Sequence, residues 1–182
     1  MTNKNKKAFT LVELLVVIAI IGLLSTIAVI SMSTARAKGR DGVRIADIKQ
    51  ISTALEQYYT DNNSYPGAVA AGNALGSGSG QTNCHTGATN ACSCLSSIGF
   101  DSTCTAPTYM TNVPTYPSVV TTVACAGTYT TPTYAAGQFC YYSDVTSAAS
   151  ANYKLTVTLE NGFNGTAAKN CVYTNTSGLS CS

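Results

Sequence analysis

The feature that most constrains this 182-residue chain is an almost uncharged apolar run near its N-terminus. Residues 9–32 carry one charge, Glu13, and between residues 14 and 30 only Gly22, Ser25 and Thr26 are not hydrophobic. A helix needs about 20 apolar residues to cross a bilayer, and its backbone polar groups stay paired in lipid. The run is therefore predicted to form a transmembrane helix.

Cations and cysteines occupy opposite ends of the chain. Lys4, Lys6 and Lys7 precede the apolar run, although four more cations follow it between residues 36 and 44, and all eight cysteines come after residue 83. Cations beside a membrane segment favour its cytoplasmic side. Cysteines in this number favour disulfides, which persist in oxidising compartments. Together these signals predict a cytoplasmic N-terminus and a C-terminal region outside the cytoplasm.

A cleavable secretory signal peptide is the alternative interpretation of this N-terminus. Such a signal has a short apolar region followed by small residues at the cleavage site. Residues 31–37 (Ser-Met-Ser-Thr-Ala-Arg-Ala) resemble such a site, but the apolar run is longer than a typical signal core. The helical pattern also continues through these residues, so the sequence favours a retained helix.

Glu13 is the residue of the apolar run that most strongly indicates a function. A carboxylate inside a membrane helix costs about 2.5–3.5 kcal/mol on insertion scales and therefore needs a partner. No cation follows Glu13 within the run, and Lys6 and Lys7 precede it. One partner is an α-amine that proteolysis creates just upstream, in the same or a neighbouring chain. The alternative is that Glu13 is hydrated at the membrane interface.

Residues 6–14, Lys-Lys-Ala-Phe-Thr-Leu-Val-Glu-Leu, resemble the class III signal of type IV pilins and pseudopilins. The resemblance implies that a prepilin peptidase removes residues 1–8 by cutting between Ala8 and Phe9. It further implies that Phe9 is then N-methylated and that Glu13, the fifth residue of the mature chain, helps subunits to pack.

The resemblance covers residues 1–67, because the segment from Tyr58 to Pro66 also resembles the end of the first helix in this family. There a Tyr, an Asp/Asn-rich turn and Tyr-Pro follow one another. The chain departs from the family at two positions. Ala8 stands where Gly is usual, and Ile30 stands where many major pilins have Pro.

Beyond residue 36 the pattern changes from apolar to amphipathic. Hydrophobic residues recur there at helical spacing: Ile45, Ile48, Ile51, Leu55, Tyr58 and Tyr59. The helix is predicted to stop at about Asp61, before an Asn-rich segment and Pro66. A row of alternating charges is predicted either to face solvent or to pair with neighbouring subunits of a filament: Lys38, Asp41, Arg44 and Asp47.

The C-terminal region contains one clear strand pattern. Residues 153–160 alternate strictly between apolar and polar, and residues 138–143 and 170–174 are its predicted neighbours. With the resemblance, this predicts an α+β fold, in which the long N-terminal helix packs on a small antiparallel sheet with a disulfide-rich C-terminal head. The chain then has four parts: a leader at 1–8, a hydrophobic transmembrane or filament-core helix at 9–32, its amphipathic continuation at 33–62, and a globular β head at 63–182.

All eight cysteines are predicted to form disulfides, in a pairing that the sequence leaves open. They are Cys84, Cys92, Cys94, Cys104, Cys125, Cys140, Cys171 and Cys181. A structural zinc site needs two matched ligand pairs, and a calcium site needs an acidic cluster. Neither pattern is present, so no metal and no cofactor is predicted.

No catalytic motif is recognisable: the chain has no G-x-S-x-G, no P-loop and no paired-carboxylate motif, so no enzyme is predicted. A net charge of +2 gives no argument for a nucleic-acid site. The resemblance instead implies a structural subunit of a type IV pilus, a homo-oligomeric helical filament that serves adhesion, motility or DNA uptake. Such a subunit is inserted in the inner membrane, processed by prepilin peptidase and passed by an inner-membrane assembly platform to the extracellular filament.

Two other functions remain open on the sequence. One is a pseudopilin of a type II secretion system, whose N-terminal motif is the same. The other is a monomeric membrane-anchored extracellular binding module, which has no use for the spacing between Phe9 and Glu13 and predicts an uncut N-terminus at Met1.

Overall fold

The computed structural model describes residues 9–68, 72–76, 92–117, 125–132, 134, 137–144, 150–163 and 170–182. Ala8 and Cys84, two of the predicted site residues, lie outside the described residues. The chain divides into two compact units, one ending at Ala37 and the other comprising Lys38–Ser182. We describe each unit by itself.

The helix α1 (Leu11–Asn62) confirms the long N-terminal helix that the sequence predicts. It ends where Asn63 adopts a left-handed backbone (φ 52°) and its N–H donates to the Tyr59 carbonyl at 2.8 Å. Asn tolerates this conformation better than most residues, and a residue in this conformation commonly follows the last turn of a helix. The end of the helix is therefore encoded locally.

A five-stranded antiparallel sheet forms the larger β layer, in the order β1-β5-β6-β7-β8. Its strands are β1 (Asn73–Leu75), β5 (Phe139–Ser143), β6 (Tyr153–Thr158), β7 (Asn170–Thr174) and β8 (Gly178–Cys181). The three strands β5, β6 and β7 confirm the predicted strand and its two neighbours. β1 and β8 extend this sheet at its two edges.

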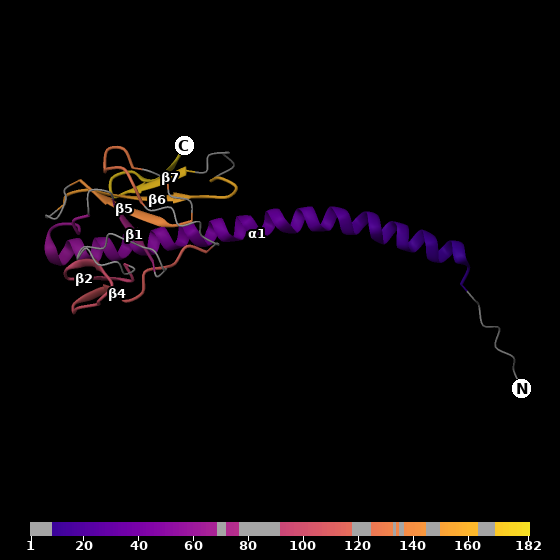
Figure 1. Cartoon of the computed structure of the whole chain (residues 1–182), viewed down its shortest axis with the longest axis horizontal. Coiled ribbons are helices and arrows are strands. Elements are labelled where there is room, and N and C mark those ends of the chain that lie inside the picture. Colours follow the sequence, from indigo (N-terminus) through magenta and orange to yellow (C-terminus); the bar gives the residue numbers. More distant parts are fainter. Residues whose placement is uncertain are drawn as a thin grey trace, which may run out of the picture. The chain divides into compact units, whose positions relative to one another are not determined.

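A second sheet contains three short strands in the order β3-β2-β4. They are β2 (Cys94–Ser96), β3 (Gly99–Asp101) and β4 (Thr108–Met110). In the view of Figure 1, β5, β6 and β7 are drawn above the later part of α1, and β2 and β4 below it. The second unit thus contains two sheets, whereas the sequence predicted one.

The main core lies between α1 and the inner face of the five-stranded sheet. Ile48, Ile51 and Leu55 on the helix are fully buried, as are Tyr153 and Leu155 on β6. The hydroxyls of Ser52 and Tyr153 are hydrogen-bonded at 2.9 Å, which satisfies the polar end of a buried ring. The predicted apolar face of the helix is therefore the face that packs.

The outer face of the sheet is also partly covered. Thr156, predicted to point outward, is only 1% exposed. It lies opposite Cys140 of β5, and Cys140 belongs to a small second cluster with Ala74, Cys125 and Tyr142. Strict alternation predicts which face a side chain takes, but not whether that face is covered.

Three disulfides join cysteines of the described region. They are Cys94–Cys104, Cys125–Cys140 and Cys171–Cys181, with Cα–Cα distances of 5.8, 5.7 and 4.0 Å. Cys92 is disulfide-bonded as well. Each bridge typically adds about 2–4 kcal/mol to stability, which matters most in a head made of short strands.

Candidate processing and assembly site

The candidate assembly site starts at the first turn of α1, where Thr10 and Glu13 form a capping box. The Thr10 N–H and the Thr10 hydroxyl each donate to Glu13 Oε2 at 2.8 Å. In return, the Glu13 N–H donates to Thr10 Oγ1 at 3.3 Å. This reciprocal arrangement satisfies backbone N–H groups that the first helical turn leaves unpaired.

The capping box gives Glu13 a partner that the sequence analysis missed. The sequence left open whether a free α-amine neutralises its carboxylate or water hydrates it at the membrane interface. Thr-x-x-Glu before an apolar run is nevertheless a signature of a helix start, and Thr10-Leu11-Val12-Glu13 fits it. The signal for this partner is therefore local and present in the sequence.

The apolar side chains of the first unit are exposed around the whole helix. Phe9 is 88% exposed and Leu11 79%, and the most apolar 18-residue stretch of α1 has a mean hydropathy of 2.8 with none of it buried. Among the described residues, α1 is the one helix long and apolar enough to cross a membrane by length and composition. An apolar surface of this extent marks a membrane or protein contact.

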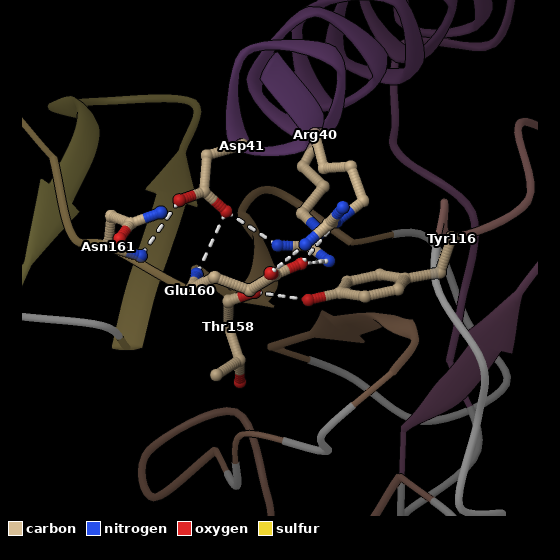
Figure 2. Close-up of polar contacts among 7 residues, drawn as sticks. Arg40, Asp41, Tyr116, Thr158, Glu160 and Asn161 are labelled. Atoms are coloured by element: carbon tan, nitrogen blue, oxygen red, sulfur yellow. Dashed lines mark hydrogen bonds and ion pairs between the residues drawn. The ribbon is translucent and has the colours of Figure 1, made fainter. Parts of the chain in front are cut away.

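An ion cluster of four residues lies in the second unit, between α1 and the chain that leaves β6 (Figure 2). Arg44 contacts Asp41 Oδ1 through one terminal nitrogen and Glu160 Oε1 through the other, both at 2.5 Å. Arg40 donates to the same Glu160 carboxylate at 2.8 and 2.5 Å. The Arg44 side chain is 1% exposed, whereas that of Arg40 is 42% exposed.

Further contacts fix the geometry of this ion cluster. Asp41 accepts the backbone N–H groups of Glu160 at 2.8 Å and Asn161 at 2.9 Å. The Arg44 guanidinium lies 4.4 Å from the centre of the Tyr116 ring, and the Tyr116 hydroxyl donates to the Thr158 carbonyl (Figure 2). The cluster therefore attaches the helix to the end of β6.

The ion cluster corrects the interpretation of the charged row on the helix. Asp41 and Arg44 do not face solvent, and their charges are not left for a neighbouring subunit to pair, because both residues are buried and paired within the chain. Their partner Glu160 is 116 residues from Arg44. Helical spacing reports only neighbours on the same helix, so a partner at this separation was invisible in the sequence.

The ion cluster predicts how stability depends on pH. The Arg40 hydrogen bond, supported by Arg44, lowers the pKa of the Glu160 carboxyl from 4.5 to about 2. A lowered folded-state pKa stabilises the fold above pH 4.5, and this contribution is lost as the pH falls towards 2. Denaturant unfolding of the full chain should therefore give the native protein a higher free energy of unfolding than Glu160→Gln. This difference should stay constant from pH 7 to 5 and shrink below pH 4.5. A difference that does not change with pH would contradict this prediction.

Within the described ranges, no group of three or more His, Cys, Asp and Glu side chains has a geometry that could hold a metal ion. The candidate assembly site is a capped carboxylate at the start of an exposed apolar helix. Phe9 lies one residue before Thr10, at the start of that helix.

Comparison with known proteins places this site in a family context. Residues 3–29 match the family model described as "Prokaryotic N-terminal methylation motif". The chain thus carries the class III prepilin signal that its residues 6–14 resemble, and the predicted resemblance to type IV pilins and pseudopilins is confirmed.

Several curated proteins are similar to part of the chain. The type IV wide pilus major component PilA4 of Thermus thermophilus is 41% identical over 73 residues, which are 40% of this chain and 56% of that protein. The type II secretion system core protein G of Aeromonas hydrophila is 35% identical over 66 residues, 36% of this chain and 46% of that protein. A fimbrial protein of Neisseria meningitidis serogroup B is 36% identical over 67 residues, 36% and 38% of the two chains.

The chain spans about half the length of the first of these relatives. No solved structure matches the chain. The family model thus supports the N-terminal signal and the first part of the helix.

Proposed function

We propose that this protein is a structural subunit of a type IV pilus filament that assembles through its N-terminal helix after leader cleavage. The observation that carries the proposal is the coincidence of the methylation motif at residues 3–29 with a helix that is apolar and exposed on all sides. Such a surface needs lipid before assembly and other apolar helices afterwards. The names of the pilus relatives support the same class of protein.

The proposed mechanism is processing followed by polymerisation. Prepilin peptidase cuts between Ala8 and Phe9 and frees the Phe9 amine, which is then methylated. The apolar helices leave the membrane through an inner-membrane assembly platform and bundle in the filament core. There, the Phe9 amine of one subunit neutralises Glu13 of the next, so that a buried charge pair sets the register rather than adding net stability.

This proposal assigns a role to each part of the chain. Residues 1–8 are the leader, residues 9–32 are the segment inserted in the membrane and later in the filament, and residues 33–62 continue the helix into the head. Residues 63–182 form the surface that the filament presents outside the cell. Adhesion, motility or DNA uptake would depend on that surface.

A pseudopilin of a type II secretion system is the second candidate function. It is supported by the similarity to core protein G in several bacteria, including Aeromonas hydrophila and Pseudomonas aeruginosa. A monomeric membrane-anchored binding module is the third, and it has less support because it does not use the methylation motif.

The deciding experiment is the intact mass of the protein in filaments sheared from its native cells and in the membrane fraction, with and without reduction. For a pilus subunit, we expect the protein in sheared filaments to have the mass of a chain that begins at methylated Phe9. This mass should increase by about 2 Da for each disulfide that is reduced. Processed protein confined to the membrane fraction would favour a pseudopilin. A chain still starting at Met1 in the mature membrane pool would contradict both and favour the anchored module.

A further inference from the structure

A groove in the second unit has no role in the proposed function. It lies between one face of α1 and the strand β4, and its volume is about 770 Å³. The helix contributes residues 47, 50, 53, 54 and 57, which share one face over about 15 Å. Strand β4 and the chain as far as Pro114 form the opposite wall. This volume is typical of sites for small ligands.

The walls of the groove offer hydrogen-bonding groups that the protein itself does not use. Asp47, Gln50, Gln57 and Asn112 all line the groove, where Gln50, Gln57 and Asn112 are exposed, and none of the four has a side-chain hydrogen bond or ion pair within the part of the chain that the structure describes. Each amide provides two donors and an acceptor, and the carboxylate provides acceptors only. Partial burial raises the pKa of the Asp47 carboxyl, as expected for a desolvated group without a cation beside it.

The floor and one wall of the groove give it a fixed shape. Ala54 is 4% exposed and belongs to the same buried core cluster as Ile51 and Leu55, which fixes the part of the helix that lines the groove. The ring of Tyr109 packs edge-on against Tyr58 with centroids 5.2 Å apart. The Tyr109 hydroxyl also accepts a hydrogen bond from Asn62 at 3.1 Å. The ring is therefore held in place before any ligand arrives.

We propose that this groove binds a short neutral oligosaccharide. A pyranose ring has an apolar C–H face, which suits the side of a fixed aromatic ring, and a rim of hydroxyls that act as both donors and acceptors. The amides of Gln50, Gln57 and Asn112 can likewise both donate and accept hydrogen bonds, so they can pair with these hydroxyls.

Charge and shape argue against other ligands. Neither Lys nor Arg lines the groove, so an acidic sugar would meet Asp47 without a compensating cation. An extended peptide added to the edge of β4 would need alternating apolar pockets for its side chains. Here the strand has only three residues, and seven of the eleven residues that line the groove have polar side chains without an aromatic ring.

The test uses the purified full chain in alkyl-phosphocholine micelles, because glycoside detergents would compete for the groove. Saturation-transfer NMR would measure binding of maltotriose, cellotriose, chitotriose and mannotriose, with sialyllactose as the acidic comparison. We expect saturable binding of at least one neutral trisaccharide with a Kd below about 10 mM, and weaker binding of sialyllactose. Preferential binding of sialyllactose, or no saturable binding of any neutral trisaccharide, would overturn the proposal.

Substitutions then locate the binding site. Gln50→Ala and Asn112→Ala should each weaken binding about 3- to 10-fold through the loss of one hydrogen bond. Ala54→Met should abolish binding by filling the floor. Lys49→Ala, an exposed neighbour on α1 that does not line the groove, is the matched control and should bind as the native protein does.

Circular dichroism of each variant would show that the fold is kept. Equal binding by the native chain, Gln50→Ala and Ala54→Met would place the sugar elsewhere and overturn the proposal. A loss of filament assembly in Ala54→Met, with no trisaccharide bound by the native chain, would also overturn it and identify the groove as a contact between subunits. These outcomes do not depend on leader cleavage, so they are separate from the test of the proposed function.

Discussion

Glu13→Ala is expected to abolish filaments in the sheared fraction while the head of the protein remains folded. In the proposed filament, the Glu13 carboxylate neutralises the Phe9 amine of a neighbouring subunit. Removing it leaves a buried charge without a partner, a change that typically costs about 3–5 kcal/mol for each contact. Because a filament repeats this cost at every subunit, assembly should fail. Electron microscopy and the amount of protein in the sheared fraction measure the result.

The matched control is Glu13→Gln, which separates the charge from the capping box. In the structure, the Thr10 N–H and hydroxyl donate to the Glu13 carboxylate. A Gln at the same position accepts such a bond, so the helix start is kept and the charge is lost. Both variants should fail to assemble if the charge sets the register. Normal filaments from Glu13→Gln would show that assembly needs Glu13 for the capping box and not for its charge.

Arg44→Met is expected to lower the free energy of unfolding of the second unit by about 3 kcal/mol. Removing one partner from a buried ion pair typically costs about 3–5 kcal/mol, because the other charges stay buried. The low end applies here, since Asp41 keeps two backbone N–H groups and Glu160 keeps Arg40. Urea denaturation of the full chain, followed by tyrosine fluorescence, would measure this loss.

Arg40→Gln is the control, because the Arg40 side chain contacts the same carboxylate but is 42% exposed, against 1% for Arg44. Exposed ion pairs contribute about 0–1 kcal/mol, so this variant should lose far less stability than Arg44→Met. Equal losses in the two variants would mean that burial of Arg44 does not decide the strength of the ion cluster.

The long helix and the central strand of the larger sheet could be predicted because each has a hydrophobic pattern that repeats over several residues. The apolar run and the spacing of Ile48, Ile51 and Leu55 specify a helix with a known buried face. The alternation along residues 153–160 specifies β6, and the segments on either side of it become β5 and β7. In each case several residues carry the same signal.

The remaining features depend on too few residues or on distant ones. Each strand of the sheet β3-β2-β4 has three residues, which is too short to show an alternation. The ion cluster requires Glu160 to meet Arg44 through the tertiary fold. The candidate site was found through Phe9 and Glu13, yet the role of Thr10 was missed although its signature is local.

The sequence separation between Arg44 and Glu160 also determines when this ion pair can form during synthesis and folding. The helix is made first, and the carboxylate that pairs with its buried cation is made 116 residues later. Chains are synthesised from the N-terminus, and contacts between distant residues form late because the intervening loop must first close. A chain cut short before Glu160 therefore keeps Arg44 paired with Asp41 alone and lacks the second carboxylate that Arg44 contacts on the face that should pack. Only a complete subunit can close its core, so truncated chains remain distinguishable from finished ones before they reach a filament.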